Sequence, residues 1–109
     1  MVCAVDCDLV INPDIVKAQM EGGIGFGLSP TLMSAVTIEK GRVVETNFDS
    51  HRVLRMKDMP NIETHIVSSS EPPTGVGEPA TPVISPAVAN ALFAKTQVVQ
   101  NRLPLNLDV

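Results

Sequence analysis

Apolar positions recur along the first third of the chain at the spacing of one buried helical face. They lie four residues apart, at Val16, Met20, Ile24 and Leu28. Asn12 and Pro13 precede this stripe, and they are typical of a helix start because asparagine caps the first turn and proline suits the first helical position. We therefore expect a helix from Pro13 that ends or kinks near Leu28, since Pro30 cannot continue the backbone hydrogen bonds.

Runs of β-branched and alternating apolar residues predict four strands. The expected strands cover residues 2–6, 34–39, 42–48 and 61–67. Lys40 and Gly41 separate the two middle strands and predict a hairpin turn. A second helix is expected from Ser85 and Pro86, with serine as the cap and proline at the first position.

The order strand, helix, three strands, helix predicts an α/β (α+β) fold. We expect a mostly antiparallel sheet of about four strands, covered on one face by two helices. With 109 residues, the chain is expected to form a single domain over residues 1–109 with a thin core. The tail after the second helix is expected to be extended or loose.

Composition narrows the classes of function. The net charge is −4 and the eight basic residues are scattered, which argues against nucleic-acid binding. No apolar run approaches the roughly 18 residues of a membrane span. Cys3 and Cys7 share one side of the first strand without a second pair, so we expect free thiols rather than a metal site, and a reducing, cytoplasmic location.

Glycine is concentrated in two stretches, "EGGIGFGLS" within the first helix and "GVGEPA" in a proline-rich loop. The loop matches a loose dinucleotide-binding fingerprint, but Pro79 and Pro82 prevent a helix from starting there, so we reject that interpretation. The helix glycines predict a very close approach to the backbone. Composition alone favours close packing against a strand as its cause.

Two polar residues near these glycines are candidates for chemistry. Glu78 lies between Gly77 and Pro79 without a neighbouring counter-charge. A covered loop would make this carboxylate a better proton acceptor, whereas an exposed loop would leave an ordinary solvated acid, and the residues alone leave both interpretations open. Gln19 could bind a planar ligand through its amide, although its spacing favours an ordinary helix-surface residue.

Three stretches of the chain resemble a known family of enzymes. They are "AVDCDLVINPDIVKAQMEGGIGFGLS", "FDSHRVLRMKDMPNIETHIV" and "GVGEPATPVISPAVANALF". Together they are similar to the C-terminal end of the molybdenum-binding large (beta) subunit of the xanthine oxidase family, in the branch of isoquinoline 1-oxidoreductase and aldehyde dehydrogenase-like subunits. The resemblance extends over about residues 2–104. The combination of Gln-x-Glu-Gly-Gly with Gly-x-Gly-Glu-Pro is specific, whereas either motif alone is weak.

The resemblance implies an oxidoreductase that hydroxylates N-heterocycles or oxidises aldehydes. Glu78 would be the general base that takes a proton from a molybdenum-bound hydroxide. The residues that the resemblance assigns to the pterin cofactor, molybdopterin cytosine dinucleotide, are Gln19, Gly22, Gly23, Gly75 and Gly77. Ala80 departs from the family pattern, which usually has glycine at that position.

Family members run to several hundred residues, so the resemblance implies that this chain is a fragment. Its partners would be the remainder of the molybdenum-binding subunit, a 2Fe–2S small subunit and a small-molecule substrate, in the cytoplasm or the periplasm. We expect no bound cofactor and no turnover for the chain alone. The alternative is a freestanding non-catalytic remnant that acts as a structural or interaction domain, and an isolated chain with exposed apolar surface is expected to form a homo-oligomer.

Overall fold

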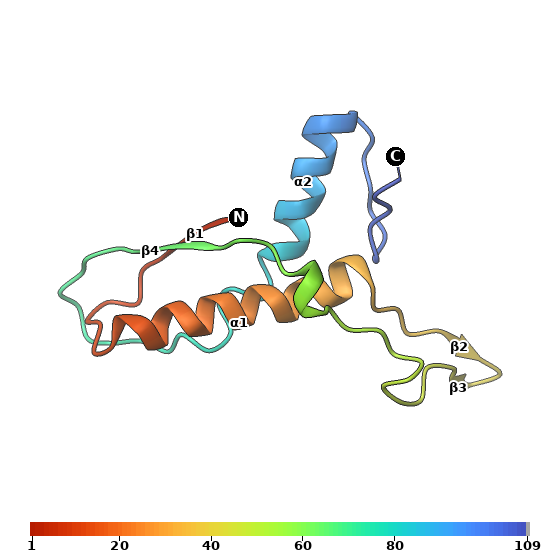
Figure 1. Cartoon of the computed structure of the whole chain (residues 1–109), viewed down its shortest axis with the longest axis horizontal. Coiled ribbons are helices and arrows are strands. Elements are labelled where there is room, and N and C mark those ends of the chain that lie inside the picture. Colours follow the sequence, from red (N-terminus) through yellow and green to blue (C-terminus); the bar gives the residue numbers. More distant parts are fainter. Residues whose placement is uncertain (109) are drawn as a thin grey trace.

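One long helix forms the body of the molecule. The computed structural model describes residues 1–108, and Figure 1 shows an elongated arrangement with a hairpin at one end and a second helix standing away from the body. The elements, in chain order, are β1 (Val2–Val5), α1 (Pro13–Leu32), β2 (Ile38–Glu39), β3 (Arg42–Val43), the short 3-10 turn η1 (Met56–Asp58), β4 (Glu63–Ile66) and α2 (Ile84–Thr96).

The expected four-stranded, mostly antiparallel sheet is wrong. Among the described residues, β1 pairs with β4 in parallel, and β2 pairs with β3 in a separate antiparallel ladder. Cys3 lies opposite Thr64, and Val5 lies opposite Ile66. The hairpin lies away from the other two strands, beyond the end of α1 (Figure 1). Because α1 and the hairpin separate β1 from β4 along the chain, the pairing is a crossover connection, which brings strands together in parallel.

The predicted stripe on α1 is confirmed, since Val16, Met20, Ile24 and Leu28 are all buried. These residues form the core with Val5, Cys7, Ala80 and Ile84. The cap is confirmed as well. The side-chain oxygen of Asn12 accepts hydrogen bonds from the backbone N–H groups of Asp14, at 3.0 Å, and Ile15, at 3.2 Å. The free thiols are also as expected, with Cys7 buried and Cys3 half-buried.

Helix α1 does not end near Leu28 but continues through Pro30 to Leu32. Pro30 lies in the last turn of α1. It therefore removes one backbone hydrogen bond there but does not interrupt the interior of the helix. Nearby groups stabilise this turn. The hydroxyl of Thr31 donates to the carbonyl of Gly27 at 2.7 Å, and the N–H of Leu105 donates to the carbonyl of Thr31 at 2.8 Å. The second bond also ties the C-terminal tail to α1.

Helix α2 begins at Ile84, earlier than the predicted start at Ser85 and Pro86. Its cap residue is Val83, which has no capping side-chain bond. The Ser85 hydroxyl instead lies 2.6 Å from the hydroxyl of Thr31 on α1, so it joins the two helices rather than capping one. Accordingly α2 packs against α1, and among the described residues it is α1 rather than α2 that packs against β4. The prediction that both helices cover one face of a sheet is therefore wrong.

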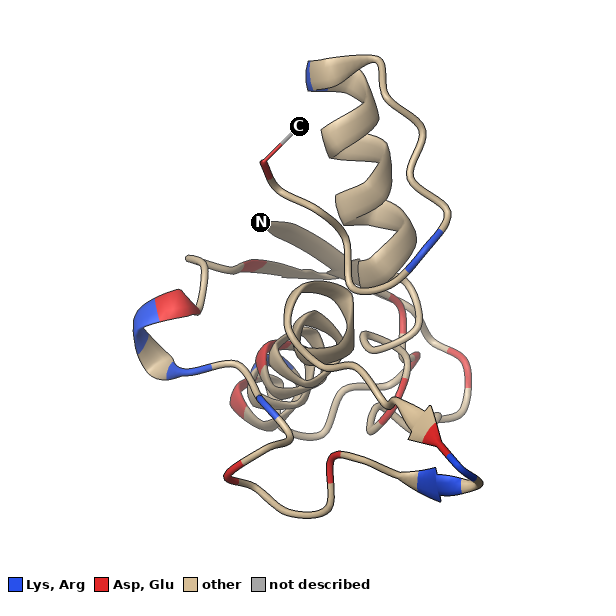
Figure 2. Ribbon diagram, turned by 90° about the vertical axis from the view of Figure 1, so that its right-hand side faces the viewer, with Lys and Arg blue, Asp and Glu red and all other residues tan. Residues whose placement is uncertain are grey.

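The β2–β3 hairpin turns at Lys40 and Gly41, as predicted, and both have positive φ angles, of 49° and 76°. Its strands are two residues long each, much shorter than expected. Figure 2 shows Lys, Arg, Asp and Glu dispersed over the loops and the outer side of α1, while α2 carries almost no charge. Its single charged residue is Lys95 in the last turn.

Candidate functional site

The proline-rich loop and the start of α2 run along α1 from its first turns toward its C-terminal half. Pro73 and Val76 line a shallow cavity together with Ile15 near the start of α1. Further along, Ala80 lies against Gly23. Figure 1 shows the loop crossing the face of α1 before the chain turns into α2. The two glycine-rich stretches of the sequence are therefore brought side by side.

Ala80 and Thr81 fasten this loop to α1. Ala80 is 2% exposed, and a Cβ atom placed on Gly23 would lie only 2.9 Å from its methyl group. The hydroxyl of Thr81 donates to the carbonyl of Gly23 at 3.3 Å. One turn later, a Cβ atom on Gly27 would lie 2.7 Å from the carbonyl oxygen of Thr81. Gly23 and Gly27 therefore form a groove in α1, called here the glycine groove, that receives the loop.

The glycines predicted to permit close approach fall into two groups. Gly23, Gly25 and Gly27 face other parts of the chain, so internal packing accounts for them. The packing partners are the loop, Met59 and the start of α2 rather than the strand expected from composition. A Cβ atom on any of three other glycines would meet no atom within 4 Å, and these are Gly22, Gly75 and Gly77.

The two polar candidates lie on the exposed surface beside this junction. Glu78 is exposed, and its backbone carbonyl accepts a hydrogen bond from the N–H of Thr81 at 2.9 Å, which closes a turn. Gln19 is exposed one helical turn before Gly23. Both side chains face solvent rather than the core in the described part of the chain.

An apolar cavity of about 360 Å³ lies elsewhere, between the C-terminal half of α1 and the chain that returns from the hairpin. Its lining includes Phe26, Val36, His51 and Val53. This cavity was not predicted from the sequence, because His51 lies in a segment without apolar periodicity. The other histidine, His65, is exposed on β4 and pairs with Glu63 at 2.8 Å.

Two negative observations limit the chemistry of residues 1–108 themselves. Over this range, the His, Cys, Asp and Glu side chains form no group of three or more that could hold a metal ion. Neither of the helices described here combines the length and apolar character needed to cross a membrane.

Comparisons with known proteins agree with this arrangement. The chain is 43% identical over 103 residues to isoquinoline 1-oxidoreductase subunit beta of Brevundimonas diminuta, which covers 94% of this chain and 13% of the relative. It is 38% identical over 101 residues to a membrane-bound aldehyde dehydrogenase (pyrroloquinoline-quinone) of Gluconacetobacter polyoxogenes, covering 93% of this chain and 13% of the relative. The chain thus spans about an eighth of the length of these curated relatives.

The fold matches a solved enzyme structure. The crystal structure of quinoline 2-oxidoreductase from Pseudomonas putida 86 superposes with a TM-score of 0.83 at 29% identity, over 93% of this chain and 14% of that one. The mixed α/β arrangement of two helices and a few short strands is therefore that of a segment of this oxidoreductase. The resemblance to molybdenum-binding subunits inferred from the sequence is confirmed.

A family description completes the comparison. The profile of the molybdopterin cofactor-binding domain matches residues 1–60, which is more than half of the chain and includes β1, the whole of α1 and the β2–β3 hairpin. This chain belongs to the molybdopterin cofactor-binding domain family.

Proposed function

We propose that this chain forms one wall of the cofactor site in a molybdenum-dependent oxidoreductase, with Glu78 as its general base. The observation that carries the proposal is the open space at Gly22, Gly75 and Gly77. None of these glycines has the positive φ angle that would demand glycine, and none has a neighbour that would exclude a side chain. The open space at these positions would admit close approach by a group outside the chain.

The side chains beside these glycines fit a pterin cofactor. Gln19 offers an amide with both donors and an acceptor, which suits the hydrogen-bonding edge of a pterin ring. Glu78 offers an exposed carboxylate at the end of the Gly75–Gly77 stretch. Gly23 contributes indirectly, because it receives Ala80 and so holds the loop beside α1.

When bound, the molybdenum-pterin cofactor supplies the oxygen-transfer and two-electron redox chemistry. The chain's own contribution is proton transfer and positioning. Glu78 accepts the proton that is released as the substrate carbon is oxidised, and Gln19 orients the cofactor by hydrogen bonding. Packing of the remaining subunit over the loop would exclude water from Glu78 and improve it as a base near neutral pH.

The remaining parts of the enzyme are inferred in the same way. The partners are the remainder of the molybdenum-binding subunit and a 2Fe–2S small subunit, and the cofactor is molybdopterin cytosine dinucleotide. The substrate is a small N-heterocycle or aldehyde, the two chemistries that the relatives' names describe. The isolated chain would neither retain molybdenum nor turn over substrate, because it provides only one wall of the site.

A hybrid subunit tests this function. Residues 1–109 would replace the matching stretch of isoquinoline 1-oxidoreductase subunit beta, to which the chain is 43% identical. We expect Glu78→Gln to lower kcat by at least about 10²-fold, as for loss of a general base, with molybdenum content unchanged. Glu71→Gln, in an exposed acid of the same loop, is the matched control and should retain the parent rate. Equal rates for the Glu78→Gln variant and the parent would refute the proposed base.

A second candidate function has its own support. Several large apolar side chains are exposed, among them Ile11 at 81%, Phe48 at 80% and Phe26 at 72%. A freestanding, non-catalytic remnant would bury such surface by self-association and act as a structural domain. Sedimentation of the isolated chain tests this alternative, which predicts a stable homo-oligomer. A monomer at micromolar concentration would contradict it.

A further inference from the structure

We infer that the close packing of the Ala80 methyl group on Gly23 positions Glu78, so that a buried contact two residues along the loop determines where the base lies. This inference rests on the proposed role of Glu78 and gives Gly23 and Ala80 the role of positioning the loop. For Gly23 this role replaces the cofactor contact that the resemblance implies. Ala80 follows Glu78 by two residues and is 2% exposed, whereas Glu78 itself is exposed. The loop backbone is therefore held at Ala80, whereas the side chain of Glu78 faces solvent.

The loop is held on both sides of Glu78. Val76, two residues before it, packs against the buried core. Ala80, two residues after it, lies on Gly23. Between them the Glu78 carbonyl accepts the Thr81 N–H at 2.9 Å, so the turn that carries the carboxylate is closed by its own backbone bond. Because the loop is held on both sides of Glu78, its backbone needs little reorganisation before the carboxylate accepts a proton.

Gly23 is the part of this arrangement that cannot be enlarged. A Cβ atom there would lie 2.9 Å from the Cβ atom of Ala80, which is attached directly to the loop backbone. Since a methyl group on a backbone carbon cannot rotate away, the turn from Glu78 to Thr81 would have to shift. Misplacement of a reacting group by about 1 Å can cost roughly 10²-fold in rate.

Gly25 provides a matched comparison on the same helix. A Cβ atom on Gly25 would lie 3.2 Å from the end of the Met59 side chain. That end is flexible and can move without any change in the backbone. Gly23→Ala and Gly25→Ala therefore add the same methyl group to the same helix, but only the first one pushes on the loop that carries Glu78.

Hydrogen exchange in the isolated chain measures the position of the turn without any cofactor. We expect Gly23→Ala to speed exchange of the Thr81 amide by about tenfold or more, because its bond to the Glu78 carbonyl is strained. Gly25→Ala should leave that rate unchanged. The double variant Gly23→Ala/Ala80→Gly should recover the parent rate, because removing one methyl group makes room for the other. Unchanged exchange in Gly23→Ala, or no recovery in the double variant, would overturn the inference.

Kinetics of the hybrid subunit then connect position to catalysis. We expect Gly23→Ala to lower kcat by about 10²-fold at unchanged KM and unchanged molybdenum content, with recovery in the double variant. A loss of molybdenum in Gly23→Ala would assign Gly23 to cofactor retention and overturn the inference. The proposed function fails separately, if Glu78→Gln is fully active. If Glu78→Gln is inactive while Gly23→Ala is fully active, only the positioning role is refuted.

Discussion

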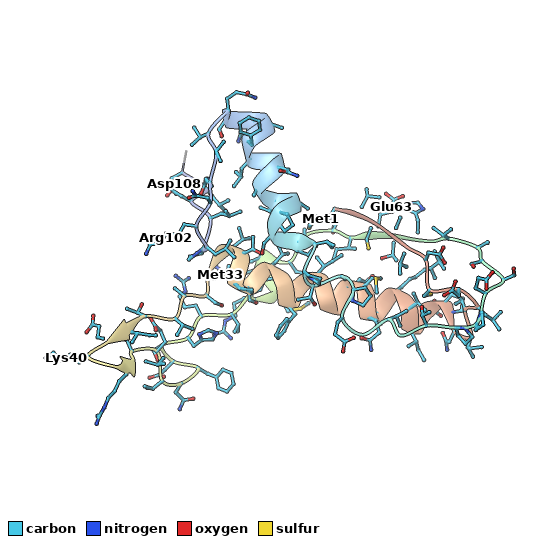
Figure 3. The ribbon with its side chains drawn as sticks, turned by 180° about the vertical axis from the view of Figure 1, so that it is seen from behind. Met1, Met33, Lys40, Glu63, Arg102 and Asp108 are labelled. Atoms are coloured by element: carbon cyan, nitrogen blue, oxygen red, sulfur yellow. The ribbon has the colours of Figure 1, made fainter. Side chains whose placement is uncertain are left out.

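The hydroxyl oxygen of Thr31 on α1 lies 2.6 Å from the hydroxyl oxygen of Ser85 on α2. Thr31 is fully buried, and its hydroxyl also bonds to the carbonyl of Gly27 at 2.7 Å. Figure 3 shows α2 rising from α1 close to the end of that helix, where Met33 is labelled. A pair of hydroxyl groups thus joins the helices at the point where they cross, beside the glycine groove.

Removing this pair should destabilise the chain. Thr31→Val keeps the shape of the side chain but leaves the half-buried Ser85 hydroxyl without its partner. We expect the free energy of unfolding to fall by about 1–3 kcal/mol, measured by urea denaturation. Thr96→Val is the control, because the Thr96 hydroxyl bonds only within its own helix end, to Leu92 and Val98. An equal loss in both variants would show that the interhelical bond contributes nothing specific.

Two glycines of α1 should respond in opposite directions to the same substitution. A Cβ atom on Gly27 would lie 2.7 Å from the Thr81 carbonyl oxygen, so we expect Gly27→Ala to destabilise the chain by about 1–3 kcal/mol. Gly22 faces open space, and Gly22→Ala should stabilise the isolated chain by about 0.5–1 kcal/mol through helix propensity. Thermal denaturation of the two variants measures both effects. Changes of the same sign would contradict the assignment of Gly27, and not Gly22, to the glycine groove.

The open glycines of the loop should matter to the cofactor but not to the fold. Gly75→Ala and Gly77→Ala are expected to change the stability of the isolated chain by less than about 0.5 kcal/mol, since each meets no atom within 4 Å. In the hybrid subunit the same variants should lower molybdenum content. Thr74→Val, an exposed position in the same loop, is the control for that assay. Full molybdenum content in both glycine variants would remove the support for close approach at this loop.

The base of the β2–β3 hairpin should open at acid pH. The Thr37 backbone N–H donates to the Glu45 carboxylate at 2.7 Å, and this bond is the main reason that the Glu45 pKa lies below its ordinary value, with a smaller contribution from His51. A lowered pKa in the folded chain means that the contact stabilises the hairpin above the ordinary carboxyl pKa. The stabilisation is lost as pH falls through the lowered value.

Nuclear magnetic resonance of the Thr37 amide follows this titration. Its chemical shift should move as Glu45 takes up a proton, at a pH below the ordinary carboxyl range. Glu45→Gln keeps an oxygen acceptor but cannot titrate, so the same amide should not respond to pH in that variant. A Thr37 amide that is insensitive to pH in the unaltered chain would contradict the contact.

Local signals made the first helix and the hairpin turn predictable. Asn12 caps α1 through bonds to its nearest neighbours, and Gly41 adopts a positive φ angle that glycine permits, so both depend on adjacent residues. The pairing of Val5 with Ile66 depends on residues 61 positions apart, and no alternation pattern states whether such a pair is parallel. Ser85 illustrates the same limit, because a capping residue in the sequence became an interhelical partner of Thr31.

The residues of the candidate site could be predicted from the sequence, but their arrangement in space could not. Glycine composition indicated a close approach to α1, yet it could not distinguish Gly23, which receives Ala80, from Gly22, which faces open space. That difference depends on which side of the helix the loop crosses. The role of Glu78 remains a prediction that the kinetic experiments test.

The glycine groove also links the position of Glu78 to the orientation of α2. The chain leaves Gly23 at Ala80, passes Gly27 at Thr81 and Ile84, and continues directly into α2. A change in the tilt of α2 would consequently move the turn that carries Glu78. Substitutions around α2, for instance those that admit a wider molecule, would thereby change the position of the Glu78 carboxylate without changing any residue next to it.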